Sequence, residues 1–144
     1  MPTPSASELK KALVSEGFEI YRTLGEHVLI AERVRDNLIM DSGVAAVVGD
    51  ALRVEFRVRA QGNDFPGESE AQLFERARRL ASAGIERGYN EVETSIVPIR
   101  DPGDRSRTLD TWYEVVFHKD VSDTAELFDE LRHAITLEKT ATRG

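Results

Sequence analysis

Cysteine is missing from this chain of 144 residues, and several other residue types are scarce. Without cysteine there is no disulfide framework and no thiolate chemistry. The three histidines, His27, His118 and His133, show neither HxH nor HExxH spacing, so we expect no zinc site. Four lysines stand against 15 arginines. Arginine suits bidentate recognition better than lysine does, although biased codon use gives the same ratio.

Long hydrophobic runs are also missing. No run of about 18 apolar residues predicts a membrane span, and the N-terminal MPTPSASE has no basic region followed by an apolar core, as a secretory signal would. The default expectation is therefore the cytoplasm. The net charge of −7, from 26 acids and 19 bases, disfavours nucleic acid and anionic membranes as partners.

Catalytic and phosphate-binding motifs are missing as well. The chain contains no GxxxxGK[ST], no GxGxxG after a strand and no GxSxG. Ser42, in Asp-Ser-Gly, is typical of a turn serine and has no visible base to activate it. We therefore expect no catalytic residue, no metal and no cofactor. An enzyme that uses loop carboxylates or His118 is the least supported hypothesis.

Several carboxylates lie near strand ends or in loops, and the sequence does not show whether any two of them converge. These residues are Asp36, Asp41, Asp64, Glu91, Glu93, Asp101 and Asp104.

What is present is the composition of a soluble globular domain, with 40% hydrophobic and 31% charged residues. The length corresponds to a single domain, 1–144, that can bury a core without disulfides. Residues 1–5 and 139–144 are expected to be flexible tails.

Three helices are predicted from capping signals and apolar stripes. Ser5 and Glu8 have capping-box spacing, which predicts a helix over 6–16 that ends at Gly17. A second helix begins after Ser69, ends at Gly88 and carries the stripe Leu73, Phe74, Ala77, Leu80, Ala81, Gly84 and Ile85. A third follows a cap at Ser122 or Asp123 and presents Leu127, Phe128, Leu131, Ala134 and Ile135 on one face.

The stretch DFPGESE, residues 64–70, has two interpretations. It groups acids around a Pro-Gly pair, as a catalytic loop would. Phe65 to Glu68 also matches a type II turn with Gly67 at the position that needs a positive φ, and Ser69 follows as a helix cap. Turn chemistry explains every residue, so we interpret the stretch as the start of a helix.

Strands are predicted between the helices, at 18–23, 27–34, 37–40, 44–48, 51–60, 90–99 and 108–119. Turns are expected at Leu24-Gly25-Glu26, Asp41-Ser42-Gly43, Gly49-Asp50 and 100–107. Pro98 indicates that its strand lies at a sheet edge. Helices gathered on one face of sequentially paired strands predict an α+β fold, a two-layer sandwich with an antiparallel sheet.

Strand 51–60 alternates strictly. Leu52, Val54, Phe56, Val58 and Ala60 point one way, and Arg53, Glu55, Arg57 and Arg59 point the other. The outward row Arg53, Arg57 and Arg59 is a candidate binding surface for a carboxylate, a phosphate or an acidic partner segment. The alternative is an ordinary solvent-exposed face on which Glu55 offsets part of the arginine charge. Arg100, Arg105 and Arg107 form a second candidate group. Replacing both Arg57 and Arg59 by Glu is expected to keep the fold and weaken binding.

Trp112 is the one residue whose face the pattern does not decide. Thr111, Tyr113, Val115 and Phe117 alternate with Trp112, Glu114, Val116 and His118. In one register Trp112 and Val116 form an outer apolar patch of the kind used by partners. In the other register Trp112 belongs to the core.

The layout from Ser69 to Thr136 is a helix ending at glycine, a strand, and a second strand (TWYEVVFHK) running into a helix opened by VSDTAELFDEL. This order resembles the YbjN-like proteins and the type III secretion chaperones. The resemblance is one of layout, carries over no functional residue, and implies a non-enzymatic dimer that holds an extended or partly unfolded segment of another protein.

Two functions follow as expectations. The first is a protein-binding module, adaptor or chaperone-like and dimeric, that binds through Arg53, Arg57, Arg59, Trp112 and Val116. The alternative is a sensor or regulatory domain that binds a small anionic ligand through surface arginines.

Overall fold

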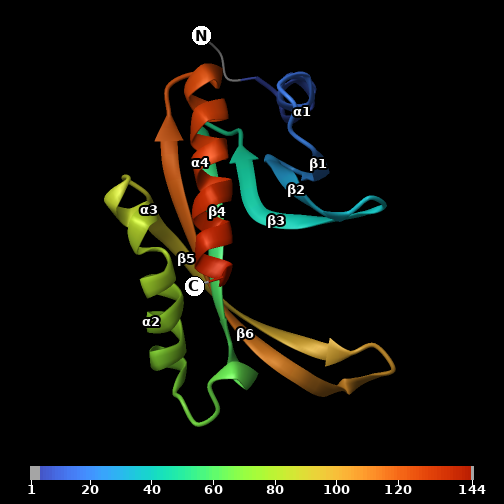
Figure 1. The fold of residues 1–144 in the computed structure, drawn as a ribbon, viewed down its shortest axis with the longest axis vertical. Helices are drawn as coiled ribbons and strands as arrows, with labels where there is room; N and C mark the ends of the chain where they lie inside the picture. The colour runs from blue at the N-terminus through green and yellow to red at the C-terminus, as the bar shows by residue number, and fades with distance from the viewer. Residues whose placement is uncertain (1–3, 144) are drawn as a thin grey trace.

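The computed structural model describes residues 4–143, which form one six-stranded sheet and four α-helices (Figure 1). All strand pairs are antiparallel, and the order across the sheet is β1-β2-β3-β4-β6-β5. The predicted α+β fold is confirmed. The strands are β1 (Ile20–Leu24), β2 (His27–Arg35), β3 (Leu38–Val47), β4 (Leu52–Gln61), β5 (Asn90–Asp101) and β6 (Asp104–Val121). The helices are α1 (Ala6–Ser15), α2 (Glu70–Leu80), α3 (Ser82–Glu86) and α4 (Thr124–Arg143), with a short 3-10 turn, η1, at Gly62–Asp64.

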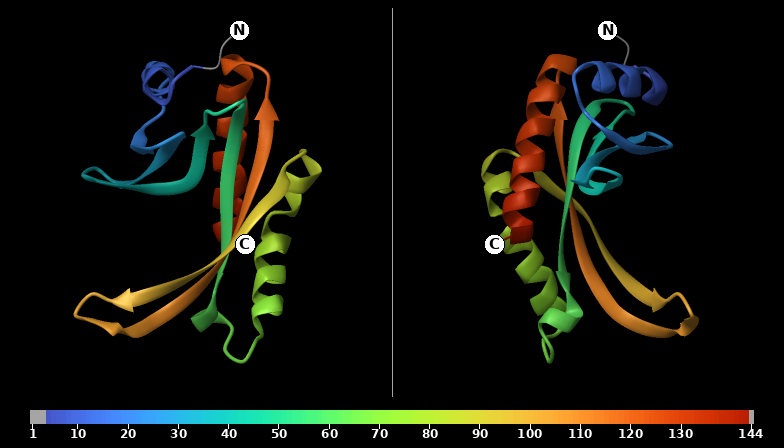
Figure 2. Two further views of the ribbon diagram at one scale, coloured as in Figure 1. Left: turned by 180° about the vertical axis from the view of Figure 1, so that it is seen from behind. Right: turned by 45° about the vertical axis from the view of Figure 1, so that its right-hand side comes forward.

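The helices cover one face of the sheet, and two hairpins project from the other. α4 packs on β3 and β4, α2 on β4 and β6, and α1 on β1 and β2. In the right-hand view of Figure 2, the free ends of the β2–β3 and β5–β6 hairpins extend away from α4 and α2. We call these hairpin ends the two arms and the sheet face on their side the outer face.

Phe56 lies at the centre of the core, which confirms the predicted faces of β4. Its ring stacks on Phe117 at 5.2 Å and meets the edge of Tyr89 at 4.9 Å. Gly84 packs directly on this ring, since an added Cβ would lie 2.6 Å from Phe56 Cζ. Leu52, Val54, Val58 and Ala60 are buried on the same side.

The predicted caps are confirmed. Ser5 and Ser69 each form a complete capping box, with Glu8 and Gln72. Asp123 caps α4 by accepting the N–H of Glu126 at 2.8 Å. The stretch DFPGESE is a turn and a cap, as predicted: Gly67 has φ +86° and the N–H of Glu68 bonds the carbonyl of Phe65.

The structure describes part of each predicted tail. Of the N-terminal tail, 1–5, residues 1–3 lie outside the described residues. At the other end α4 includes 139–143, which we expected to belong to a tail.

One predicted turn is wrong and another is shorter than predicted, because the strands continue into the residues assigned to them. Asp41-Ser42-Gly43 is a bulge within the single strand β3, because β2 pairs with the residues on both sides of it. Residues 100–107 belong mostly to β5 and β6, and Asp101 lies opposite Asp104, so the turn at the predicted Asp-Pro-Gly centre is limited to Pro102 and Gly103.

The second predicted helix is also wrong in part. It divides at Ala81 into α2 and α3, which brings Gly84 onto the sheet, and Leu80 and Ile85 of its stripe are exposed.

The pairing of β6 decides the face of Trp112. Ala60 lies opposite Tyr113 and Val58 opposite Val115, so Tyr113 and Val115 face the helices and Trp112 lies on the outer face. β5 is the last strand of the sheet, which confirms the edge predicted from Pro98. In the described part of the chain, no helix is long and apolar enough to cross a membrane.

Candidate functional site

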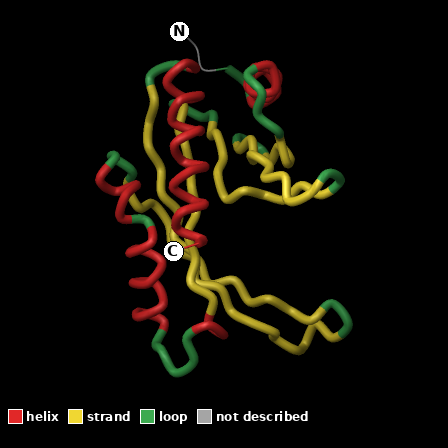
Figure 3. Tube along the Cα trace, in the orientation of Figure 1, coloured by secondary structure: helices red, strands yellow, loops and turns green. Residues whose placement is uncertain are grey.

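The sheet divides between β3 and β4. These strands pair only over Val44–Val47 and Arg53–Phe56. Beyond that point β4 stays with β6 as far as Gln61, while Leu38–Asp41 stay with β2. In Figure 3 the two hairpins leave the common sheet in different directions. We call the space between the diverging strands the cleft.

A β-bulge directs β3 away from β4. Gly43 has φ +83°, a conformation that side chains disfavour. Its N–H donates to Oδ1 of Asp41 at 2.9 Å, and the N–H of Val44 donates to Oγ of the buried Ser42 at 3.2 Å. A bulge bends its strand and ends regular pairing. The Asp-Ser-Gly signal of the sequence therefore marks the start of the cleft.

Asp41 also bridges the cleft to Arg57. Nη2 of Arg57 donates to Oδ2 of Asp41 at 2.6 Å. Burial, the largest influence, acts to lower the pKa of Arg57, but the hydrogen bond and charge of Asp41 outweigh it and the pKa is raised. Nε of Arg57 is buried and has no acceptor in the described structure. A buried donor without a partner is unfavourable and rare, and a ligand reaches this nitrogen only if the Arg57 side chain moves.

The cleft has a volume of about 670 Å³, within the range of sites that bind ligands. Its apolar lining comes from Val58 and Ala60 of β4, Phe65 and Leu80. Met40 of β3 is also apolar, and Gly43 has no side chain. The rest of the lining is charged or polar and comes from both sides: Glu32, Asp41, Ser42, Arg57, Arg59, Gln61, Asp64, Arg76, Arg79 and Glu114. Of the loop acids whose convergence the sequence left open, Asp41 and Asp64 share this cleft.

The arginines of the cleft differ in how fully they are paired. Arg57 and Arg76 have carboxylate partners at 2.6 and 2.8 Å, Asp41 and Glu68. Arg59 lies 4.0 Å from Glu114, beyond hydrogen-bonding distance. Arg79 has no ion pair with any described residue.

Backbone groups along both sides of the cleft are unpaired. In a strand, alternate residues direct their N–H and C=O to opposite neighbours. From Arg57 to Gln61 the β6 side is paired, but no backbone bond to another described residue forms on the cleft side. The same holds for Leu38–Asp41 on β3. A cleft flanked by two unpaired strand edges has the hydrogen-bonding groups to bind another polypeptide backbone.

Trp112 and Val116 lie on the outer face but differ in access. The guanidinium of Arg59 stacks on the Trp112 ring at 3.9 Å, and the indole N–H donates to Asp110 at 3.2 Å. Val116 is only 8% exposed, so it does not extend an apolar patch around Trp112. Arg53 is paired with Asp50 and Asp120 at the other end of β4. The predicted binding residues that lie together are thus Arg57, Arg59 and Trp112.

The second arginine group lies elsewhere. Arg100, Arg105 and Arg107 occur around the turn of the β5–β6 arm, where Arg100 donates to the hydroxyl of Thr108. None of the three lines the cleft.

His118 belongs to a cluster on the outer face. Its Nε2 lies 2.9 Å from Oε1 of Glu55, and Nε2 of His27 lies 3.3 Å from the same oxygen. Glu55 is buried and joins β2 to β6 across β3 and β4. In the part of the chain that the structure describes, no three carboxylate or imidazole groups are arranged to hold a metal ion.

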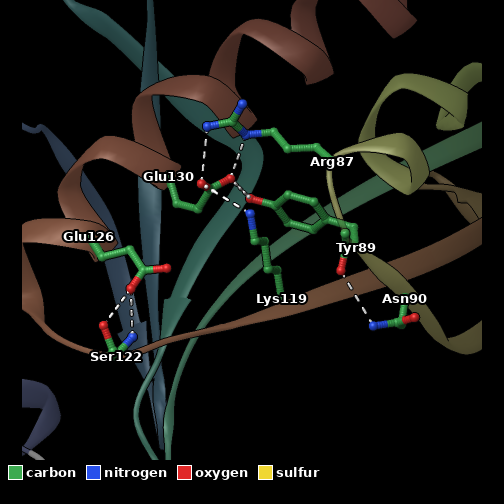
Figure 4. A network of polar contacts seen from close by, with 8 residues as sticks. Arg87, Tyr89, Asn90, Lys119, Ser122, Glu126 and Glu130 are labelled. Atoms are coloured by element: carbon green, nitrogen blue, oxygen red, sulfur yellow. Dashed lines mark hydrogen bonds and ion pairs between the residues drawn. The ribbon is translucent and has the colours of Figure 1, made fainter.

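The most buried charge is Glu130 of α4, which the sequence did not single out (Figure 4). It receives two hydrogen bonds from Arg87, at 2.8 and 3.1 Å, and one from the Tyr89 hydroxyl at 3.3 Å, and it pairs with Lys119. Burial acts to raise the pKa of Glu130, but the bonds from Arg87 and Lys119 lower it overall. Burial also raises the pKa of Tyr89. The network fixes α4 to β6 and to the segment between α3 and β5, so we assign it to stability.

No family model, curated protein or solved structure matches the chain. The resemblance to YbjN-like proteins and type III secretion chaperones stays a prediction.

Proposed function

We propose that this protein is a non-enzymatic binding module, adaptor or chaperone-like, that holds an extended segment of another protein in the cleft. The observation that carries the proposal is the pair of strand edges, unpaired on the cleft side, that flank the cleft. A small ligand does not use a row of backbone donors and acceptors, whereas an extended polypeptide does.

The sensor hypothesis has less support. A small anion needs positive charge that is free to receive it. Arg53 and Arg57 are already bound to carboxylates, and acids in the cleft lining balance its arginines. An anionic ligand at Arg53 or Arg57 would have to displace Asp120 or Asp41. A thermal-shift screen with anionic metabolites tests whether any ligand binds there or at Arg59.

An enzymatic reading of the cleft is weaker still. The described residues that line it include no histidine, cysteine or lysine. Its one hydroxyl nucleophile, Ser42, accepts a backbone hydrogen bond, is buried and has no adjacent base.

Dimerisation and location belong to the same proposal. Exposed apolar side chains outside the cleft gather on the β2–β3 arm: Val34, Leu38 and Ile39. A second copy would cover them, and light scattering of the purified protein tests this. We place the protein in the cytoplasm, with neither nucleic acid nor membrane as its partner.

Site-specific photo-crosslinking in the native host tests the function. The photoreactive residue p-benzoylphenylalanine replaces Met40, which lines the cleft and is 53% exposed. The matched control places it at Val14 of α1, which is 55% exposed and outside the cleft. We expect a protein adduct from position 40 that maps to one contiguous segment, and none from position 14.

A second variant ties the adduct to the cleft. Arg59→Glu reverses one charge of the cleft lining without breaking a short ion pair, and Arg105→Glu makes the same change on the β5–β6 arm. Arg57→Glu is less suitable because it would also break the 2.6 Å ion pair with Asp41, whereas the nearest carboxylate to Arg59 is Glu114 at 4.0 Å. We expect Arg59→Glu to reduce the adduct and Arg105→Glu to leave it. Equal adducts from positions 40 and 14, or the reverse response to the two charge changes, would refute the proposed function.

A further inference from the structure

We infer that the bound segment adds to the sheet as a β-strand, pairing with Arg57–Gln61 of β4, and that it alternates apolar residues with residues that include a carboxylate. This inference rests on the proposed function and specifies the class of partner and the mode of binding.

The edge of β4 is the strand edge best prepared for this addition. It is held on its other side by β6, residue for residue from Leu52 to Gln61, and α2 and α4 pack against it. The five residues Arg57–Gln61, which have no partner on the cleft side, span about 17 Å at the usual rise per residue. A rigid template reduces the entropy lost when a flexible segment binds.

The free edge along β5 is protected instead. It carries Pro98, which has no N–H to donate, and the exposed acids Glu91 and Glu93. Proline and charge are how proteins keep edge strands from pairing. The β4 edge has no proline between Arg57 and Gln61, and its charged residues there, Arg57 and Arg59, are both positive, so a segment that carries a carboxylate can pair with it. The contrast indicates that pairing is prevented at β5 and permitted at β4.

The cleft lining favours apolar residues on the face of the added strand that points toward the helices. Val58 and Ala60 point toward the helices, and Phe65 and Leu80 line the cleft on that side. Leu80 is 36% exposed, although it belongs to the apolar stripe of its helix. A strand beside β4 would direct every second side chain to this site, where an apolar side chain would cover Leu80. The ring of Phe65 lies beside it under the guanidinium of Arg76, at 4.0 Å.

On the outer face, Arg57 and Arg59 favour a hydrogen-bond acceptor on the added strand. Arg57 and Arg59 project on that face, and the buried Nε of Arg57 has no partner. The guanidinium of Arg59, stacked on Trp112, has its nearest carboxylate at 4.0 Å. A carboxylate on the intervening residues of the added strand would complete this pairing with charge-assisted hydrogen bonds.

The probe for this inference is a displayed library of random peptides of about nine residues, long enough to cover the five-residue edge with flanks. It is selected against the full-length protein, and the enriched peptides are then synthesised with single N-methyl groups at each position in turn. N-methylation removes one backbone donor and leaves the side chain in place.

Strand addition predicts an alternating response. Methyl groups at every second residue should weaken binding about ten-fold or more, while those between them change it about two-fold or less, because only alternate N–H groups face β4. The enriched peptides should carry apolar residues in one phase and a carboxylate in the other. Arg59→Glu should weaken them, and Arg105→Glu should not.

The outcomes separate this inference from the function on which it rests. Peptides that need Arg59 but show no alternation would overturn strand addition and leave binding in the cleft intact. A failure to enrich any peptide that responds to Arg59→Glu would count against both. A dimer that dissociates on Arg59→Glu, together with no enriched peptide, would overturn the inference by showing that a second copy occupies the edge.

Discussion

Asp41 bridges the two sides of the cleft, and removing its carboxylate should destabilise the protein by a calculable amount. Oδ2 receives Arg57 at 2.6 Å, and Oδ1 receives the N–H of Gly43 at 2.9 Å. A hydrogen bond to a charged group contributes about 1.5–3 kcal/mol and a neutral one about 1 kcal/mol. The Arg57 and Asp41 side chains are 30% and 26% exposed, so solvent screening reduces the first figure to about 1–2 kcal/mol.

Two substitutions separate these contributions. Asp41→Ala loses both bonds and should lower the free energy of unfolding by about 2–3 kcal/mol. Asp41→Asn keeps an oxygen for Gly43 and loses only the ion pair, so its loss should be about 1–2 kcal/mol. Urea denaturation at neutral pH measures both from the shift of the midpoint at constant slope.

A double-mutant cycle with Arg57→Gln then isolates the pair. The coupling between Asp41→Asn and Arg57→Gln should be about 1–2 kcal/mol, because each single change leaves the other group without its partner. A coupling below about 0.3 kcal/mol would show that the two side chains do not meet in solution. The bridge across the cleft, and its geometry as described, would then be refuted.

Three further predictions concern the core and the buried charge. Phe56→Ala should lower stability by about 3–5 kcal/mol in urea denaturation; a loss below about 1 kcal/mol would reverse the faces of β4. Gly84→Ala gains about 1 kcal/mol of helix propensity but sets a Cβ 2.6 Å from Phe56 Cζ, for a net loss of about 1–2 kcal/mol. In a Phe56→Leu background the same change should be neutral or stabilising, and equal losses in both would contradict the packing. Glu130 has a folded pKa below its ordinary 4.5, so its stabilisation is present above that pH and lost as the pH falls through the folded value. Glu130→Gln should therefore lower stability by about 1.5–3 kcal/mol at pH 7, with the deficit closing below pH 4.5; a constant deficit in pH-dependent denaturation would contradict this.

The sequence predicted those features that local chemistry decides. The faces of β4 follow from strict alternation, since arginine and glutamate alternate with apolar residues along the whole strand. The capping boxes at Ser5 and Ser69 depend on residues three positions apart. In each case the residues that fix the structure are neighbours in the chain.

Features that depend on pairing between distant strands were not predicted. Asp-Ser-Gly suits a turn or a bulge equally, and the pairing of β2 on both sides of it decides for the bulge. β6 has apolar residues in both phases, Val115 and Phe117 in one and Trp112 and Val116 in the other, so its pattern has no contrast from which to assign a face. The partners of Glu130 include Arg87, 43 positions away, and no local signal joins them.

The candidate site was predicted in part for the same reason. Arg57, Arg59 and Trp112 were identified from one strand pattern and one rare residue. Phe65 and Leu80 come from a turn and a helix whose local signals describe only their own elements. The cleft itself is the place where β3 and β4 stop pairing, and no residue pattern in either strand predicts it.

Amide hydrogen exchange along β4, resolved by residue, tests the central claim most directly. In the free protein all amides of Arg53–Phe56 should be protected, because β3 pairs on one side of this segment and β6 on the other. From Arg57 to Gln61 the alternate amides that point into the cleft should exchange rapidly, because nothing pairs with them. Bound to a selected peptide, those same alternate amides should slow by about ten-fold or more. Amides that are slow in the free protein, or that stay fast in the complex, would contradict strand addition at β4.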